Sequence, residues 1–203
     1  MLTIHGNPRS TCTRKVLMTL AESATPFELV TVDLAKGEHK SEAYLRRQPF
    51  GRVPALQDGG FELHESRAMC RYIARKAGSA LAPGDVEADA RMEQWISIET
   101  SEFTPHAMKF VYHHVFQRAQ EPAVLEAAGK ALDATCAVMD KQLARAPFIA
   151  GATFTLADVF FMPYLEYAMG TPARDIIAKH GRVAAWWKQI GERSTWRKVV
   201  GKG

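Results

Sequence analysis

A proline at the start of a short apolar segment is the feature that most constrains how this chain folds. Proline lacks an N–H and is excluded from the middle of a sheet, but Pro54 stands where a strand begins. A cis Val53-Pro54 bond would turn the backbone outward and leave the N–H and C=O of Val53 open to an added strand. Shortly afterwards, Ser66 opens a helix whose N-terminal N–H groups suit a carboxylate. Together these features predict a site for a thiol peptide, such as a tripeptide with a carboxylate at each end.

Composition places the chain among globular proteins. With 203 residues, 47% of them hydrophobic, it can bury one or two cores, and no apolar run approaches the roughly 20 residues of a membrane span. Residues 1–5 lack the basic start and long apolar centre of a signal peptide. The three cysteines are an odd number without the spacing of a disulfide framework or a zinc site, which suits a reducing compartment. We therefore expect a cytoplasmic protein without a metal and without a membrane partner.

The net charge of +4 is unevenly divided along the chain. The whole excess of Lys and Arg over Asp and Glu lies in residues 1–78. No basic stretch is interleaved with aromatic residues as in nucleic-acid-binding proteins. The charge pattern therefore favours a small anionic ligand over a nucleic acid.

Residues 1–78 have the order of elements typical of a thioredoxin-like domain. Apolar periodicity predicts a strand, a helix and a strand, followed by a β-hairpin that turns at Asp58-Gly59-Gly60 and a final helix. In order, these elements are expected at residues 2–5, 11–23, 28–33, 53–57 with 61–64, and 66–76. The sequence therefore predicts a βαβ unit followed by a ββα unit.

The rest of the chain is expected to form a linker at residues 79–87 and an all-helical domain at 88–203. The linker contains Gly, Ser and Pro, and helical periodicity follows it. Thr155 and Asp158 have the spacing of a capping box, with Phe154 and Val159 as a hydrophobic staple, so their role is structural. Helices are expected at 88–117 with a bend near Pro105, at 122–144, after Thr155 with Pro163 inside, at 174–179 and at 183–193.

Several ordered motifs resemble the glutathione S-transferase family, most closely its phi class. The motifs are Gly6-Asn7-Pro8-Arg9-Ser10-Thr11-Cys12, Gly37-Glu38-His39-Lys40, Gln48-Pro49-Phe50-Gly51-Arg52-Val53-Pro54, Glu65-Ser66-Arg67-Ala68, and Gly151 followed by Phe154-Thr155-Leu156-Ala157-Asp158. The resemblance implies an enzyme with a thioredoxin-like α/β domain and a C-terminal all-α domain, and glutathione as cosubstrate. Two residues depart from the phi pattern, because Gln48 stands where Asn is usual and Arg52 where Gln is usual.

Ser10 is the candidate catalytic residue. A cysteine thiol with a pKa of about 8.5 is mostly protonated near neutral pH, whereas the thiolate is the nucleophile. A serine hydroxyl just before a helix can donate to the sulfur beside the positive end of that helix. From its position alone, Ser10 is more often only an N-cap, and the family resemblance is what favours catalysis.

The remaining glutathione contacts are implied by the resemblance. His39 and Lys40 would bind the glycine carboxylate, and Arg52 could join them as a second cation with a bidentate fork. Glu65 and Ser66 would hold the γ-glutamyl ammonium and carboxylate. The glutathione-binding residues expected in this way are His39, Lys40, Arg52, Val53, Pro54, Glu65 and Ser66.

The pocket for a hydrophobic electrophile is expected between the two domains. Its expected residues are Thr11, Cys12, Phe110 and His114. Phe103, Phe110 and His114 share one helix face, which is explained either by core packing or by a lining role. His106, His113 and His114 lack a nearby carboxylate or cysteine constellation, so no metal site is expected. The electrophile itself stays open, and a hydroperoxide, which would make the enzyme a glutathione peroxidase, is among the alternatives.

Two other functions remain open. Cys12 could form a mixed disulfide with glutathione and support thiol transfer or dehydroascorbate reduction, although the pair of cysteines of redox proteins is absent from residues 10–13. The same fold also serves as a non-catalytic binding or interaction module. Cys70 and Cys136 fall on apolar helix faces and are expected in the core.

The position of Phe50 in a short loop favours a homodimer. Phe50 lies in a short loop with little local core, and the resemblance implies an aromatic residue that inserts into the partner chain. A two-fold pairing would use this contact twice. The alternative is that Phe50 folds back over its own domain.

Overall fold

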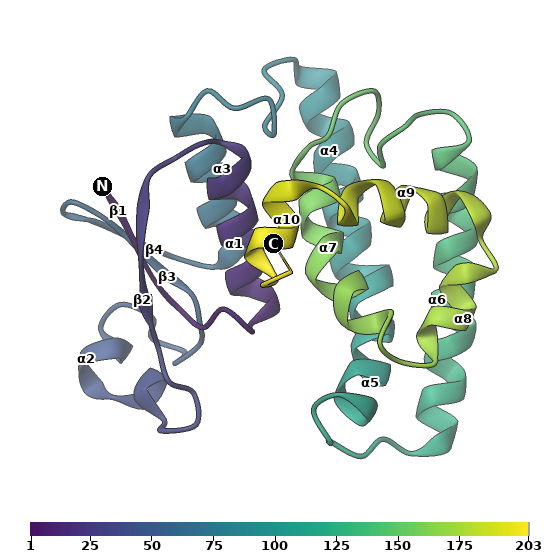
Figure 1. Ribbon diagram of the computed structural model, residues 1–203, viewed down its shortest axis with the longest axis horizontal. Coiled ribbons are helices and arrows are strands. Elements are labelled where there is room, and N and C mark those ends of the chain that lie inside the picture. Colours follow the sequence, from purple (N-terminus) through teal and green to yellow (C-terminus); the bar gives the residue numbers. More distant parts are fainter. Residues whose placement is uncertain (203) are drawn as a thin grey trace. The chain divides into compact units, whose positions relative to one another are not determined.

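The computed structural model describes residues 1–202 and divides into two compact units (Figure 1). Unit 1 consists of Met1–Ala82 with the C-terminal segment that begins at Ser194, and unit 2 is Pro83–Arg193. The predicted boundaries at 78 and 88 lie close to this division, but the expected helical domain also included the C-terminal segment. That segment belongs instead to unit 1.

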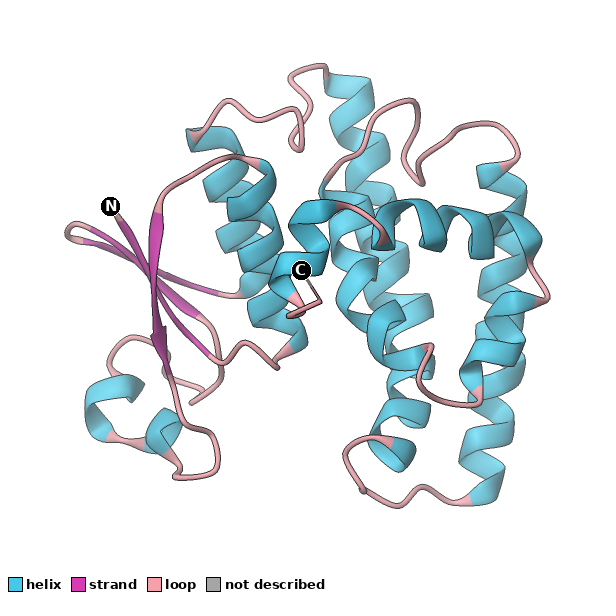
Figure 2. Ribbon diagram, viewed as in Figure 1, coloured by secondary structure: helices cyan, strands magenta, loops and turns pink. Residues whose placement is uncertain are grey.

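Unit 1 is built on a four-stranded mixed sheet in the order β2-β1-β3-β4 (Figure 2). The strands are β1 (Leu2–Gly6), β2 (Phe27–Thr31), β3 (Ala55–Asp58) and β4 (Phe61–His64). β1 runs parallel to β2 and antiparallel to β3, and β3 pairs antiparallel with β4. The predicted βαβ and ββα units are therefore confirmed, and so is the thioredoxin-like fold class.

Two helices, α1 (Thr11–Glu22) and α3 (Ser66–Lys76), pack against each other on one face of this sheet (Figure 1). Ile4 and Leu56 are paired across β1 and β3 and are buried, as expected for the face that carries these helices. Side chains alternate between the faces of a strand, so Ala55 points to the opposite face. There it packs in a buried cluster with Val32 and with Tyr44 of the short helix α2 (Glu42–Leu45).

The C-terminal helix α10 (Ser194–Val199) was not predicted from the sequence. It packs against α1, with Trp196 buried and Thr195 Oγ1 donating a hydrogen bond to the carboxylate of Glu22. A helix of six residues is marginal alone, so burial of Trp196 within unit 1 stabilises it. Periodicity over so short a segment carries little signal.

Unit 2 is helical throughout its regular elements. Its helices are α4 (Val86–Ile98), α5 (Thr104–His114), α6 (Pro122–Leu143), α7 (Leu156–Ala168), α8 (Ala173–Ala178) and α9 (Gly181–Gly191). The predicted long helix over 88–117 is interrupted by a π-helical turn, η2 (Glu99–Phe103), directly before α5. Pro105 then occupies the first turn of α5, where its missing N–H is tolerated. The expected bend is thus an interruption just before the proline.

The predicted capping box at the start of α7 is confirmed, because the N–H of Thr155 donates to Oδ2 of Asp158 at 3.0 Å. Oδ1 of Asp158 accepts from the N–H of Ile149 at 3.0 Å and from Nε1 of Trp186 at 2.9 Å. Burial raises the pKa of Asp158 to about 6, and these hydrogen bonds oppose that shift. Asp158 therefore ties α7 to the preceding loop and to α9.

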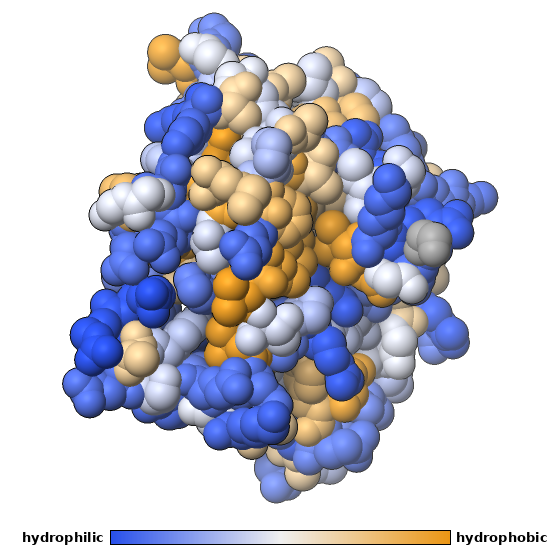
Figure 3. Space-filling model, turned by 60° about the vertical axis from the view of Figure 1, so that its left-hand side comes forward, coloured by the Kyte–Doolittle hydropathy of each residue, from blue (hydrophilic) through white to orange (hydrophobic). Residues whose placement is uncertain are grey.

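Much of the apolar composition is used in the two cores, and the surface is mixed. Hydrophilic residues cover most of the face drawn in Figure 3, with hydrophobic residues gathered in its middle. Among residues 1–202, no helix is both long and apolar enough to cross a membrane.

Candidate functional site

The predicted site residues of unit 1 lie at one edge of the sheet. The register pairs Gly6 at the end of β1 with Thr31 at the end of β2, and His5 with Ala55 at the start of β3. Ala55 in turn pairs with His64, the last residue of β4. Ser10, Val53 and Ser66 lie within four residues of these strand ends, so strand register brings their segments together, whereas Lys40 follows β2 by nine residues and is held by its own contacts.

Ser10 is the N-cap of α1, with φ −72° and ψ 131°. Its Oγ accepts a hydrogen bond from the N–H of Thr13 at 3.4 Å. This contact uses an oxygen lone pair and leaves the hydroxyl hydrogen for another acceptor. A half-buried hydroxyl at the positive end of a helix can therefore cap the helix and also donate to an anion.

Gly6 permits the close approach of α1 to the segment at Pro54. A Cβ atom on Gly6 would lie 2.8 Å from Cγ2 of Thr13 and 3.3 Å from Cβ of Pro54. Only glycine leaves this space, because real Cβ atoms essentially never approach a heavy atom so closely. Gly6 therefore allows Thr13 of α1 and Pro54 to lie close to the same point of the backbone.

The Val53-Pro54 bond is cis, as predicted. Within residues 1–202, neither the N–H nor the C=O of Val53 has a backbone hydrogen-bond partner. The preceding carbonyl, that of Arg52, accepts a hydrogen bond from the hydroxyl of Tyr44 at 2.7 Å. Burial raises the pKa of Tyr44 to about 12, so this hydroxyl stays protonated and able to donate at physiological pH.

Gln48 organises the loop that precedes Val53. It is buried, and its Oε1 accepts from the N–H of Phe50 at 2.8 Å and from the N–H of Arg52 at 3.2 Å. Its backbone carbonyl accepts from the N–H of Gly51 at 2.9 Å. The side chain of Gln48 therefore has a structural role in shaping this loop.

Lys40 is brought against the same loop. Its Nζ donates to the carbonyl of Phe50 at 3.3 Å, and a Cβ on Gly51 would lie 2.8 Å from both this Nζ and the carbonyl oxygen of His39. Gly51 has φ +58°, in the region that favours glycine, so both its conformation and its lack of a side chain are required. Arg52 is exposed, with its guanidinium carbon 5.9 Å from the centroid of the Phe50 ring. Two cations thus flank one short loop.

Glu65 and Ser66 stand at the start of α3. Glu65 has φ +69° and ψ 106°, a conformation that side-chain-bearing residues rarely adopt. Such backbone strain concentrates at ligand sites, where it aims particular groups. Ser66 is buried as the first residue of the helix, and its N–H belongs to the unsatisfied first turn.

The expected electrophile contacts are divided between the units. Thr11 and Cys12 are the first residues of α1 and are half-buried. In unit 2, Phe110 is buried with its Cζ 3.6 Å from where a Cβ of Gly129 would lie, so it packs on α6, whereas His114 is exposed. Phe103, on the same predicted face, packs against Phe161 with ring centroids 5.1 Å apart. Packing within unit 2 accounts for the two phenylalanines, and their lining of a pocket remains a prediction.

The cysteines differ sharply in environment. Cys70 and Cys136 are buried, as predicted, and burial raises the pKa of each thiol to about 12, so both are unreactive at neutral pH. Cys12 is half-buried next to the Ser10 loop. No group of three or more His, Cys, Asp or Glu side chains in the described chain is arranged to hold a metal ion.

Family models, sequence relatives and solved structures that resemble this chain all belong to one family. The family model described as "Glutathione S-transferase, N-terminal domain" matches residues 1–75, and "Glutathione S-transferase, C-terminal domain" matches residues 122–188. Glutathione S-transferase F9 of Arabidopsis thaliana is 33% identical over 100% of this chain and 97% of its own length. Glutathione transferase F7 from Populus trichocarpa has a TM-score of 0.94 at 31% identity, covering 100% and 99% of the two chains. Maize glutathione S-transferase I, solved in complex with an atrazine glutathione conjugate, has a TM-score of 0.92 at 29% identity, covering 99% and 97%. The plant relatives are F-type, or phi-class, enzymes.

Proposed function

Because this chain belongs to the glutathione S-transferase family, we propose that it joins the thiol of glutathione to a small hydrophobic electrophile, with Ser10 stabilising the thiolate. One observation carries the proposal: strand register brings the segments of Ser10, Val53 and Ser66 together at one end of the sheet, and Lys40 reaches the loop before Val53 through its hydrogen bond to the carbonyl of Phe50. Each of these residues matches a different chemical group of one extended tripeptide.

The thiolate is the reactive species, and Ser10 is placed to favour it. The thiol of free glutathione, like that of free cysteine, has a pKa near 8.5, so lowering it by about two units requires about 2.7 kcal/mol of differential stabilisation. A hydrogen bond from the hydroxyl of Ser10 to the charged sulfur, at the positive end of α1, supplies an effect of that size. Thr11 and Cys12, next in the chain, would contact the electrophile.

The rest of the peptide would bind along the same edge. The open N–H and C=O of Val53 suit pairing with the cysteinyl backbone of glutathione, as in addition of a strand. Ser66, at the start of α3, offers its N–H and hydroxyl to the γ-glutamyl carboxylate, and Glu65 offers a negative charge to the ammonium group. At the other end, Lys40 and Arg52, with His39, would bind the glycine carboxylate.

A direct test is the consumption of glutathione with a panel of electrophiles that includes an aryl halide, an isothiocyanate and an organic hydroperoxide. We expect saturable, enzyme-dependent consumption with at least one of them, and turnover of the hydroperoxide would add a peroxidase activity. The Cys12→Ser variant is the matched control, since it preserves size and removes the thiol. Reduction of dehydroascorbate that is abolished in Cys12→Ser, without conjugation by either protein, would instead make the protein a thiol transferase. Retention on immobilised glutathione without any turnover would make it a binding module.

We further propose that the protein is a homodimer in which Phe50 is the anchor. Phe50 is 62% exposed, and its ring lies 6.4 Å from the ring of His64, between centroids, and 5.9 Å from the guanidinium carbon of Arg52. A large aromatic side chain that its own unit leaves exposed favours the partner over the fold-back alternative. A cytoplasmic location is proposed on the three free cysteines.

Replacing Phe50 by Ala should therefore weaken dimerisation at least tenfold, because the two-fold axis removes the contact twice. Light scattering under dilution measures this, with Phe27→Ala as a control that removes another partly exposed ring from the edge strand β2. A Phe50→Ala dimer as tight as wild type would show that Phe50 is not the anchor. A monomeric wild type would remove the dimer altogether.

A further inference from the structure

We propose that Asn7 is a positioning residue that aims Ser10 by tying its loop to the loops that carry Lys40 and Val53. The inference rests on the proposed function, since it concerns the same glutathione site. Asn7 does not touch the reacting atoms in this proposal. It acts through the backbone that holds them.

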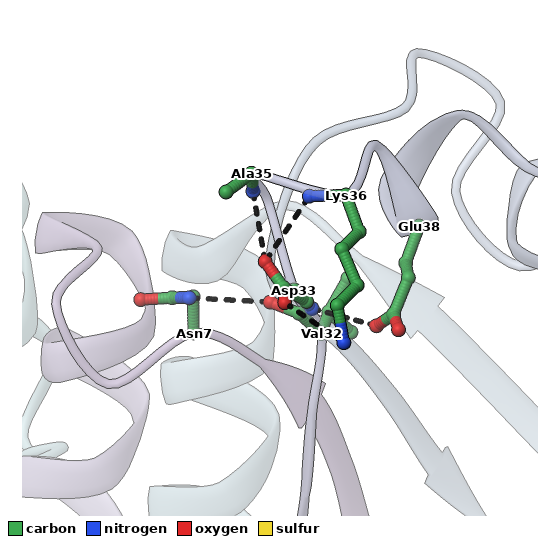
Figure 4. A network of polar contacts seen from close by, with 6 residues as sticks. All are labelled: Asn7, Val32, Asp33, Ala35, Lys36 and Glu38. Atoms are coloured by element: carbon green, nitrogen blue, oxygen red, sulfur yellow. Dashed lines mark hydrogen bonds and ion pairs between the residues drawn. The ribbon is translucent and has the colours of Figure 1, made fainter.

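Asn7 forms three hydrogen bonds from the loop between β1 and α1. Its backbone carbonyl accepts from the N–H of Ser10 at 2.9 Å, and its Oδ1 accepts from the N–H of Arg9 at 3.0 Å. Its Nδ2 donates to the carbonyl of Val32 at 3.2 Å, across 25 residues of sequence (Figure 4). One side chain therefore shapes the turn that presents Ser10 and also fastens that turn to the chain leaving β2.

The orientation of the amide group of Asn7 follows from its two partners. The N–H of Arg9 is a donor and needs the oxygen, whereas the carbonyl of Val32 is an acceptor and needs the nitrogen. A flipped amide would set donor against donor and acceptor against acceptor. The asparagine amide meets both needs, because its oxygen and its nitrogen face different partners.

Val32, the partner of Asn7, is itself held by a backbone hydrogen bond and by burial of its side chain. Its N–H donates to the carbonyl of Gly6 at 3.0 Å, which extends the pairing of β1 and β2 by one residue. Its side chain is buried in the cluster that contains Tyr44 and Ala55, and Val53 packs against this cluster. The amide of Asn7 thus couples the Ser10 turn to the residue proposed to pair with the glutathione backbone.

The residues after Val32 extend this support toward Lys40. The N–H of Asp33 donates to Oε2 of Glu38 at 2.7 Å, and the N–H of Glu38 donates back to the carbonyl of Asp33 at 3.1 Å. The carboxylate of Asp33 accepts from the N–H groups of Ala35 and Lys36, and these hydrogen bonds hold the pKa of Asp33 below its usual value (Figure 4). The loop of residues 32–37 is closed by its own hydrogen bonds and leads into the turn η1 (Glu38–Lys40). Asn7 therefore fastens the Ser10 turn to a preformed loop.

Loss of this tie should misplace the hydroxyl of Ser10 relative to the thiol. A displacement of about 1 Å at a reacting group can cost as much as a hundredfold in rate, so we expect Asn7→Ala to lower kcat about tenfold. The pH profile of kcat/KM for the electrophile, measured at saturating glutathione, reports the thiol pKa of bound glutathione. In Asn7→Ala this pKa should rise toward that of free glutathione. KM for glutathione should change less than kcat, because the proposed peptide-binding groups other than Ser10 are retained.

The Asn7→Ser variant separates the two roles of the side chain. A serine hydroxyl can still accept from the N–H two residues ahead, but it is too short to reach the carbonyl of Val32. If the tie to Val32 matters, Asn7→Ser should lose activity as Asn7→Ala does. Wild-type kcat in Asn7→Ser would overturn the proposal, since the turn alone would then be sufficient. Asn7→Ser also serves where Asn7→Ala folds poorly.

A double-mutant cycle with Ser10→Ala tests whether Asn7 acts through Ser10. In the Ser10→Ala background we expect Asn7→Ala to change kcat by less than about twofold, because the hydroxyl it positions is absent. An equal loss of kcat in both backgrounds would show a general structural role and refute the proposal. If Ser10→Ala lowers kcat and Asn7→Ala does not, only the role of Asn7 fails. If Ser10→Ala itself has no effect, the proposed catalytic role of Ser10 fails first.

Discussion

Replacing Ser10 by Ala should lower kcat with an aryl halide at least tenfold while leaving the KM for glutathione within about threefold. The reason is that the hydroxyl of Ser10 is the group proposed to donate to the sulfur, whereas the ends of the peptide would be held by other residues. A tenfold loss corresponds to about 1.4 kcal/mol of transition-state stabilisation. Steady-state kinetics over a range of glutathione concentrations measures both parameters.

The pH profile adds a signature that a merely structural role would not produce. Donation to the thiolate lowers the thiol pKa of bound glutathione, so the acid limb of the wild-type profile should lie well below the pKa of about 8.5 of a free thiol. In Ser10→Ala this limb should move to higher pH. The variant should therefore recover part of its activity in alkaline buffer.

Ser10 is also the N-cap of α1, so its substitution should cost about 1 kcal/mol of stability independently of catalysis. Asp85→Ala is a suitable control, because Asp85 caps α4 by accepting from the N–H of Ala88 at 2.9 Å. It should show a similar loss of stability with unchanged kcat. An unchanged kcat in Ser10→Ala, or a loss found in Cys12→Ser instead, would remove Ser10 from the mechanism.

The regular elements of unit 1 were predictable because each has a strong local signal. The β-hairpin has the turn Asp58-Gly59-Gly60 between two apolar runs, and β4 and α3 begin and end where the sequence predicts. The cis Val53-Pro54 bond was also predicted, since a proline at the mouth of a strand has few alternatives. The register of the sheet then converts these local signals into a common edge.

The supports of the site were not predicted, because their partners are distant in sequence or lie in the backbone. Gln48 appeared only as a departure from a family pattern, yet its side chain holds two N–H groups of the loop. Asn7 gave one usable signal, since Asn before Pro marks a turn, but its bond to Val32 spans 25 residues. Tyr44 was likewise unremarked, although its hydroxyl holds the carbonyl of Arg52. Polar side chains gain such roles only when the fold brings backbone donors or acceptors to them.

In unit 2 the sequence predicted some features of the helices well and others poorly. The capping box was found because its spacing is specific, whereas near Pro105 a bend was predicted and the structure has a π-helical turn that ends two residues before the proline. A π-helical turn has no simple sequence signature. Its Glu99 is buried and accepts a hydrogen bond from the hydroxyl of Thr104, an arrangement that apolar periodicity does not reveal.

Asp158→Ala should destabilise unit 2 by about 3 kcal/mol at pH 7, the largest loss of stability expected from any substitution considered for this chain. Three N–H groups, those of Ile149 and Thr155 and the indole of Trp186, would lose their acceptor in a buried environment. Each unsatisfied buried donor costs about 1 kcal/mol or more. Chemical denaturation followed by tryptophan fluorescence measures the loss, and Asp85→Ala, which removes an exposed cap, should cost only about 1 kcal/mol.

The loss should also depend on pH, because burial raises the folded-state pKa of Asp158 to about 6, above the value of about 3.9 for an unfolded chain. A raised pKa means that the folded state binds the proton more tightly, so the stability contributed by this carboxyl is fully present below pH 4 and is lost as pH rises through 6. Asp158→Ala should therefore be more destabilised relative to wild type at pH 5 than at pH 7. Asp158→Asn keeps one acceptor oxygen and does not titrate, so it should itself be less destabilised than Asp158→Ala, by the same amount at every pH. A constant difference between wild type and Asp158→Asn from pH 5 to pH 7 would show that the buried carboxyl titrates outside this range and that burial does not dominate its pKa.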